Sequence, residues 1–201
     1  MGGVKEGQVF TTELPKNYDG TMIDAPTGRW KDNFWDCCHA GFFHPSLWCS
    51  ICCSQLAMAQ VMTRMQLTWL GQPGPITRTR QAFLVVLILM MSYLTYGTAL
   101  ELAALPYEPQ NEPMIFTYLR MGGNILFSLY CVYALCRTRE TVRTRYQIPE
   151  QHCIGCEDLC CSIWCGCCTT AQMLRHTGEY ETYSGIWCST SGHPPGTPLV
   201  V

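Results

Sequence analysis

The sequence predicts a mainly α-helical, membrane-associated protein, in which a helical hairpin is flanked by two related cysteine-rich units, each a loop followed by a helix. Three observations predict this fold. The twenty residues 81–100 carry no charge. Cysteines gather on both sides of the apolar middle of the chain, five between Cys37 and Cys53 and seven between Cys153 and Cys168. Parts of these two clusters also repeat each other.

The chain of 201 residues is long enough for one domain with tails. We expect a cysteine-rich domain over 30–178 that contains the apolar hairpin 81–136. The segments 1–29 and 179–201 are rich in Gly, Pro, Thr and Ser, which predicts disordered tails. Charged residues form 14% of the chain, against about 25% in an average soluble domain, which favours a protein partly embedded in a membrane.

Charge and motif content exclude two broad classes of function. A net charge of −2 removes the electrostatic basis for binding nucleic acid, which needs a clustered basic surface. The acidic residues form no pattern with His and Ser that indicates a catalytic triad, and no phosphate-binding glycine loop is present in the sequence. We therefore expect neither a nucleic-acid partner nor enzymatic activity.

The first predicted span is the uncharged stretch 81–100. A helix of twenty residues is about 30 Å long, which is the thickness of a bilayer core. The alternative is the buried core helix of a soluble protein. A domain of this size rarely contains a helix that is apolar on every face, so the stretch favours membrane insertion.

The second apolar stretch, 114–136, is interrupted by Arg120 and by Gly122-Gly123. Its uncharged part, 121–136, has only sixteen residues. This length predicts either a short or tilted span, or a re-entrant or interfacial helix. Glu101 and Arg120 lie equally far from the centre of the connection, so an antiparallel hairpin brings them to similar depth. They either form an ion pair or extend separately to the interface.

The connection 106–113 is proline-rich and polar and contains no Lys or Arg, so it predicts the turn of the hairpin. Basic residues flank the hairpin instead: Arg78, Arg80, Arg137, Arg139, Arg143 and Arg145. Because positive charge stays on the cytosolic side of a membrane, both termini are expected in the cytosol. We expect the plasma membrane as the location.

The cysteines are predicted to bind metal, because cytosolic thiols stay reduced and a disulfide framework is the weaker alternative there. Thiolates suit zinc and other soft divalent metals, which take four ligands in tetrahedral sites. Cys153 and Cys156 have the C-x₂-C spacing that lets two sulfurs bind one ion, and Cys49 and Cys52 repeat this spacing. His152 is a substitute ligand. The candidate ligands are Cys37, Cys38, Cys49, Cys52, Cys53, Cys153, Cys156, Cys160, Cys161, Cys165, Cys167 and Cys168.

Other interpretations of these residues stay open. The cysteines can be buried small apolar residues, acceptors for palmitate beside a span, or redox sensors. Met58, Met62 and Met65 recur on one helical face, which indicates packing, or a copper relay. Gln60 and Gln172 predict interhelical hydrogen bonds, or the lining of a cation path.

The two cysteine clusters match each other at an offset of 112 residues. Between Leu47/Leu159 and Met65/Thr177, seven of nineteen pairs are identical, including Cys-Ser-Ile, a further Cys and Ala-Gln. This similarity predicts two related units around the hairpin. Such repeats are common in transport proteins.

Several motifs together resemble one family. They are the opening Trp35-Asp36-Cys37-Cys38, the cysteine-rich turn that leads from Cys49 to Gln60, the basic stretch Arg143–Tyr146, and the series from Cys153 to Gln172. This order, over about residues 30–178, resembles the placenta-specific gene 8 family of cysteine-rich membrane proteins. The family includes plant cadmium-resistance proteins, fruit-weight and cell-number regulators, and cornifelin.

The resemblance implies handling of divalent cations such as zinc, cadmium or calcium, by a homo-oligomer in a membrane. The first cluster departs from the family pattern. Members commonly carry Cys-Cys or Cys-Leu, four residues and Cys-Pro-Cys, where this chain has Leu47-Trp48, four residues and Cys53-Ser54-Gln55. This departure weakens the case for direct metal translocation. The alternative is a membrane-anchored structural or regulatory protein whose cysteines bind structural zinc or carry lipid.

Overall fold

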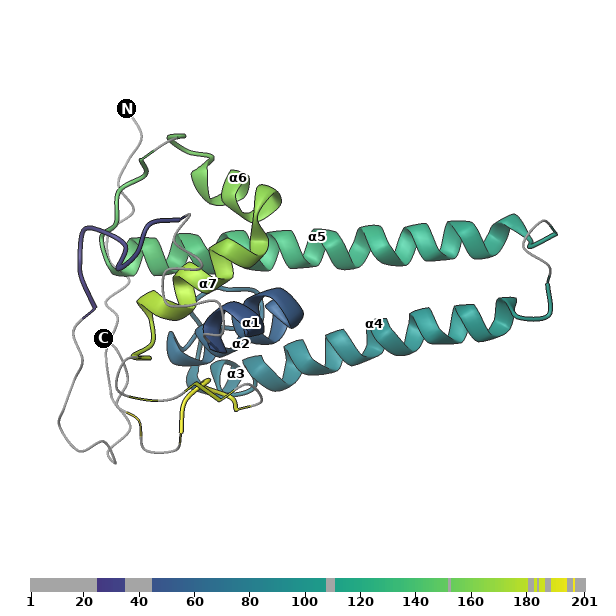
Figure 1. The fold of residues 1–201 in the computed structure, drawn as a ribbon, viewed down its shortest axis with the longest axis horizontal. Helices are drawn as coiled ribbons and strands as arrows, with labels where there is room; N and C mark the ends of the chain where they lie inside the picture. The colour runs from purple at the N-terminus through teal and green to yellow at the C-terminus, as the bar shows by residue number, and fades with distance from the viewer. Residues whose placement is uncertain are drawn as a thin grey trace.

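The computed structural model describes residues 25–34, 45–107, 111–151, 153–180, 183, 185–186, 189–194 and 197. These residues form a mainly helical protein without a β-strand among them, as the sequence predicts (Figure 1). The helices are α1 (Pro45–Cys52), α2 (Ser54–Arg64), α3 (Ile76–Thr79), α4 (Ala82–Ala104), α5 (Met114–Arg145), α6 (Glu157–Trp164) and α7 (Gly166–His176). The long helices α4 and α5 extend as a hairpin from a head that contains the five short helices (Figure 1).

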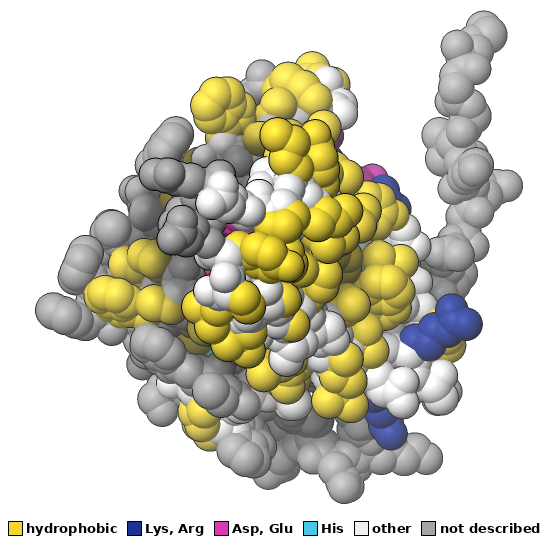
Figure 2. Space-filling view, turned by 90° about the vertical axis from the view of Figure 1, so that its right-hand side faces the viewer, with side chains coloured by type: hydrophobic (Ala, Val, Ile, Leu, Met, Phe, Trp, Pro, Cys, Tyr) yellow, Lys and Arg dark blue, Asp and Glu magenta, His cyan; other side chains and the backbone are white. Residues whose placement is uncertain are grey.

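The hairpin helices α4 and α5 are both long and apolar enough to cross a membrane. Their most apolar windows are only 6% and 11% buried, whereas the core helix of a soluble protein is mostly buried. The low burial favours membrane association over the alternative of a core helix. Seen from the loop end of the hairpin, hydrophobic side chains cover most of the described surface (Figure 2).

The second hairpin helix is longer than the sequence indicates. It runs without a break from Met114 to Arg145, through Gly122-Gly123 and past the expected end of the hairpin at Cys136. The re-entrant alternative therefore does not describe α5. Glycine is tolerated here because a long helix gains its stability from packing, and each glycine costs only about 1 kcal/mol.

Aromatic side chains hold the two hairpin helices together. A Cβ atom on Gly123 would lie 2.5 Å from a ring carbon of Tyr96, so the absence of a side chain lets this ring approach α5. The Tyr96 hydroxyl donates a hydrogen bond to the Leu119 carbonyl at 2.8 Å. Nearby, the rings of Tyr93 and Phe127 stack with centroids 4.0 Å apart. The hairpin thus has a defined helix–helix contact.

Of the two alternatives for Glu101 and Arg120, the structure contains the ion pair. Arg120 Nε lies 3.0 Å from Glu101 Oε1, and Arg120 Nη1 lies 2.7 Å from Glu112 Oε1. One guanidinium therefore joins α4, α5 and the connection between them at the far end of the hairpin.

The internal repeat is present in the helices themselves. Adding 112 to the bounds of α1 and α2 gives the bounds of α6 and α7, residue for residue. Each pair meets at a cysteine of similar backbone conformation: Cys53 has φ −140° and ψ 53°, and Cys165 has φ −147° and ψ 72°. The head therefore contains two copies of one helix–corner–helix unit.

The core of the head lies mainly between α2, α7 and the adjoining parts of α4 and α5. Met58, Met62 and Met65 are at most 2% exposed and belong to this core, which supports the packing interpretation of the methionine face. In the C-terminal segment 179–201, where we expect a tail, described residues contact α2. Gln60, for example, donates a hydrogen bond to the Ser189 carbonyl at 3.0 Å.

The hairpin contact yields a first prediction. Gly123→Leu should displace the Tyr96 ring and lower the stability of the protein in detergent by about 1–3 kcal/mol, the usual range for overpacking. Gly122→Leu is the matched control, because a Cβ atom at Gly122 meets nothing within 4 Å. Thermal unfolding of both variants checks this prediction, and equal melting temperatures would contradict it.

Candidate functional site

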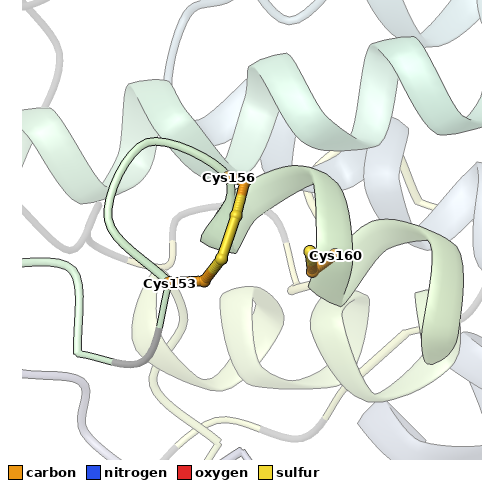
Figure 3. A group of neighbouring side chains, drawn as sticks. All are labelled: Cys153, Cys156 and Cys160. Atoms are coloured by element: carbon orange, nitrogen blue, oxygen red, sulfur yellow. A yellow bond between two sulfur atoms is a disulfide. The ribbon is translucent and has the colours of Figure 1, made fainter.

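Three cysteines gather where the loop after α5 enters α6. The Sγ atoms of Cys153, Cys156 and Cys160 all lie within 4.8 Å of one another, and we call them the first triad (Figure 3). The turn between the first two requires Gly155, whose φ of +85° other residues rarely adopt. Cys160 lies four residues after Cys156, one turn further along the helix, and so faces the same side.

Two carboxylates hold the loop that carries this triad. Glu150 accepts a hydrogen bond from the Gly155 amide, and Glu157 accepts one from the Gln151 amide at 2.5 Å. The Glu157 amide in turn donates to the Cys153 carbonyl at 2.9 Å. Because side chains satisfy the loop amides, the position of the cysteines is set by acidic residues around them.

These acidic residues are themselves bound by two arginines of α5. Arg139 is 2% exposed, and its guanidinium lies 3.2 Å from Asp158 and 3.5 Å from Glu157. Arg143 lies 2.9 Å from Asp158 and 2.7 Å from Glu150. The hydrogen bond to Asp158 raises the pKa of Arg143 further above its usual range, so this guanidinium stays protonated.

Arg139 also connects α7 and the N-terminal segment to this network. Its Nη1 donates to Gln172 Oε1 at 2.6 Å, and its guanidinium lies 4.6 Å from the centroid of the Trp30 ring. The other end of Gln172 donates to the Asp32 carbonyl at 3.0 Å. These contacts support the hydrogen-bonding interpretation of Gln172 over a role in lining a cation path.

A second triad lies at the start of α7. The Sγ atoms of Cys165, Cys167 and Cys168 lie within 4.8 Å of one another, and those of the first two are 3.6 Å apart. Cys161 belongs to neither triad. Burial raises the pKa of the Cys161 thiol above its ordinary value, so its thiolate is less accessible than that of an exposed cysteine.

Both triads contain a disulfide in this structure, Cys153–Cys156 and Cys165–Cys168. The expectation of reduced thiols therefore differs from the structure. The C-x₂-C spacing at a helix start explains both states, because it places two sulfurs side by side for either a covalent bond or a shared ion. Sulfurs on one zinc ion lie about 3.8 Å apart in tetrahedral geometry, which follows from Zn–S bonds of about 2.3 Å. The triads, once reduced, fit such an ion.

The first cysteine cluster forms no such triad among the described residues. Cys49 is buried, Cys52 is exposed and Cys53 is half-buried, while Cys37 and Cys38 lie outside the described part of the chain. The repeat explains the difference between the units. At the positions equivalent to Cys160, Cys167 and Cys168, the first unit carries Trp48, Gln55 and Leu56.

The charged network was not predicted from the sequence. Two signals in the sequence point to it: Arg139 and Arg143 lie one helical turn apart, and the acidic pair Glu157-Asp158 directly follows Cys156. Acidic residues are favourable in the first turn of a helix. In the sequence alone, Glu157-Asp158 is therefore sufficiently explained by its place at the start of a helix. Its burial against α5 becomes visible only in the fold.

A model of the PLAC8 family matches residues 30–176. The chain belongs to the PLAC8 family. This finding confirms the resemblance drawn from the cysteine motifs. The matched part includes all seven helices of the described chain, both triads and the charged network. No curated protein and no solved structure matches the chain.

The buried arginine of this PLAC8 chain yields a second prediction. Arg139→Met should destabilise the protein by about 3–5 kcal/mol, because Glu157 and Asp158 would remain buried without the positive charge of this guanidinium. Arg137→Met is the control on the same helix. Arg137 pairs with Glu140 at the surface, where an ion pair is worth about 0–1 kcal/mol. Thermal or denaturant unfolding in detergent should separate the two variants clearly.

The buried ring of His176 yields a third prediction. It packs against Trp30 and Tyr146, and burial lowers its pKa to about 4. Between its ordinary value of about 6.5 and this value, only the unfolded chain binds a proton at the ring, so the free energy of unfolding falls as pH falls through that window.

The variant His176→Phe keeps the ring contacts and removes this titration. Its melting temperature should therefore change less between pH 7 and pH 5 than that of the wild type. His193, whose pKa burial also lowers to about 4, retains part of the dependence in both proteins. If the melting temperature of the variant changed between pH 7 and pH 5 as much as that of the wild type, the assignment of this pH dependence to His176 would be wrong.

Proposed function

We propose that this PLAC8 protein is a membrane-anchored protein of divalent-metal homeostasis, which binds soft cations such as zinc or cadmium at its two cysteine triads. The main observation in support is that the structure contains two sets of three cysteine sulfurs, and within each set the sulfurs lie within 4.8 Å of one another. Buried ion pairs hold the helix that carries the first set. Soft thiolates at this spacing match the ligands that zinc takes in proteins.

The triads supply three sulfurs each, one fewer than a closed tetrahedral site. Structural zinc sites are closed by four protein ligands, whereas sites that exchange a ligand keep one position open. His152 directly precedes Cys153 in the sequence and is the candidate for a fourth ligand of the first triad, but it lies outside the described residues. The second triad has no His, Asp or Glu of the described chain within its ligand group, which suits exchange of a metal with another carrier.

Metal binding by these residues requires reduction of the two disulfides. Each disulfide takes two electrons and two protons from a cellular thiol reductant and becomes two thiols. Loss of those protons gives the thiolates that bind the cation. The reducing cytosol supplies these conditions, so we place the head there, with both termini cytosolic and the connection of the hairpin on the other side. We propose the plasma membrane as the host.

Transport of the cation across the membrane is the more specific part of this proposal. Two helices cannot enclose a pore, so conduction requires a homo-oligomer. Thr117, Asn124 and Ser128 are exposed and follow one face of α5. The Asn124 carbonyl accepts a hydrogen bond from Tyr93 at 2.9 Å, but its amide nitrogen donates to no described residue. Polar groups of this kind in lipid favour contact with a second copy of the hairpin.

A second candidate function is that of a membrane-anchored regulatory protein whose cysteines carry lipid or bind zinc only for folding. The specific observation in its favour is Cys52, an exposed thiol at the end of α1 that belongs to neither triad. A thiol beside a membrane span is a typical acceptor for palmitate. Neither candidate function involves catalysis.

The metal proposal predicts the metal content of purified, reduced protein. Wild type should hold about two zinc ions per chain, one for each triad, and Cys160→Ser should lose one of them. Cys161→Ser is the matched control, because this residue is adjacent in the helix but lies outside both triads. Metal is measured by elemental analysis beside a count of free thiols. Absence of zinc with all thiols titratable would contradict the proposal.

Cells that express the double variant Cys153→Ser/Cys156→Ser separate the two candidate functions. Loss of zinc or cadmium tolerance at normal expression and membrane location supports metal handling. Misfolding or mislocalisation of the variant supports the structural role. Unchanged tolerance and unchanged location would contradict the use of the first triad in either function.

A further inference from the structure

The two corners of the repeat carry exposed apolar side chains. The corner between α1 and α2 presents Ile51, which is 55% exposed. The equivalent corner between α6 and α7 presents Ile163 and Trp164, which are 60% and 86% exposed. In Figure 1 both corners lie on the side of the head from which the hairpin extends. These apolar side chains are in contact with water unless an apolar partner, such as lipid or protein, covers them.

The charges of the two units are placed away from these corners. No charged residue occurs between Pro45 and Thr63, or between Leu159 and Leu174. Charges return at the opposite ends of the second helices, with Arg64 in α2 and Arg175 in α7. Each unit is therefore uncharged around its corner, while Arg64 and Arg175 are buried in the head, away from the corners.

A direct contact gives the depth of one corner. At Gly166, the first residue of α7, an added Cβ atom would lie 3.4 Å from Leu135 Cδ2. Leu135 belongs to the uncharged stretch 121–136 of α5, just before the basic stretch that begins at Arg137. The α6–α7 corner is therefore level with the cytosolic end of the span.

Apolar side chains gather on the face of the molecule that is seen from the loop end of the hairpin. Figure 2 shows hydrophobic side chains over the middle of this face, with the visible Lys and Arg at one side. Tryptophan is the residue most typical of this boundary, because its ring is apolar and its indole N–H donates a hydrogen bond to the headgroup region.

We infer that the two corners insert into the interfacial layer of the same membrane leaflet, with Trp164 at the boundary between headgroups and acyl chains. The occupant of this surface is the lipid bilayer that the hairpin spans, so the inference rests on the membrane part of the proposed function. The head then lies on the membrane at three places: the hairpin and both corners.

The inference also places the second triad. Cys165, Cys167 and Cys168 directly follow Trp164, so these sulfurs lie beside the lipid headgroups, while the first triad lies at the opposite end of α6. A cation that reaches the second triad therefore arrives along the membrane surface. Anionic headgroups concentrate cations in that layer.

Fluorescence quenching by brominated lipid tests the position of Trp164. The protein is reconstituted into vesicles of phosphatidylcholine brominated on the part of the acyl chains next to the headgroups, and its emission is compared with that in unbrominated vesicles. Trp164→Phe keeps an apolar ring and removes this fluorophore. The wild type should show a quenched, blue-shifted component that the Trp164→Phe variant lacks.

A matched control moves the fluorophore to the other end of α6. The double variant Trp164→Phe/Ile154→Trp places an indole at a position that is 93% exposed, in the loop of the first triad. Its additional emission should be unquenched and typical of indole in water. Equal quenching of the wild type and Trp164→Phe would overturn the inference.

Extraction of the vesicles with alkaline carbonate shows whether a negative quenching result contradicts only the insertion of the corners or also the membrane span of the hairpin. Protein that stays in the membrane while Trp164 is unquenched overturns the corner insertion alone. Protein that is released shows that the hairpin does not span, which overturns the membrane part of the proposed function and the inference together. Zinc content, measured on the same preparation, reports on the metal proposal independently.

Discussion

The cysteine-bearing half of the head depends on the buried guanidinium of Arg139. Taking a charge out of water is costly unless opposite charges and hydrogen bonds compensate it, and here Glu157, Asp158 and Gln172 do so together. The same contacts fix α6 and α7 against α5. Because Glu157 also accepts an amide hydrogen bond from the loop before α6, the first triad takes its place from electrostatics rather than from apolar packing.

The two repeat units share a backbone but differ in their chemistry. Both have the same helix lengths and a cysteine at the corner, and both bury a glutamine in the second helix, Gln60 or Gln172. Among the described residues, only those of the second unit and the loop before it bring three sulfurs together. The first unit fills the equivalent positions with Trp48, Gln55 and Leu56 and uses its methionines as core. One unit therefore supports the head, and the other offers ligands.

The sequence predicts those features that depend on local pattern. The apolar length of 81–100 predicts α4, and the offset of 112 predicts the paired units. Symmetry about the connection predicts a similar depth for Glu101 and Arg120 and leaves an ion pair as one of two alternatives, which the structure decides. The extension of α5 to Arg145 depends instead on tertiary contacts. In the sequence its arginines indicate a solvent-exposed segment after the span, and only the fold shows that α6 packs against them. The sequence also does not show that Cys160 belongs to the first triad and Cys161 does not. This difference depends on which side of α6 faces the loop of Cys153 and Cys156, and hydropathy contains no such information.

The length of α5 has a mechanical consequence. One unbroken helix of 32 residues contains Arg120 at the far side of the hairpin and Arg139 in the head. A helix is stiff along its axis, and a change of tilt, rotation or bilayer thickness at its membrane half moves its other end as well. Since α6 is bound to that end by ion pairs, such a movement acts directly on the loop of Cys153 and Cys156. In the membrane-spanning arrangement that we propose, α5 therefore connects the bilayer mechanically with the loop that carries these thiols.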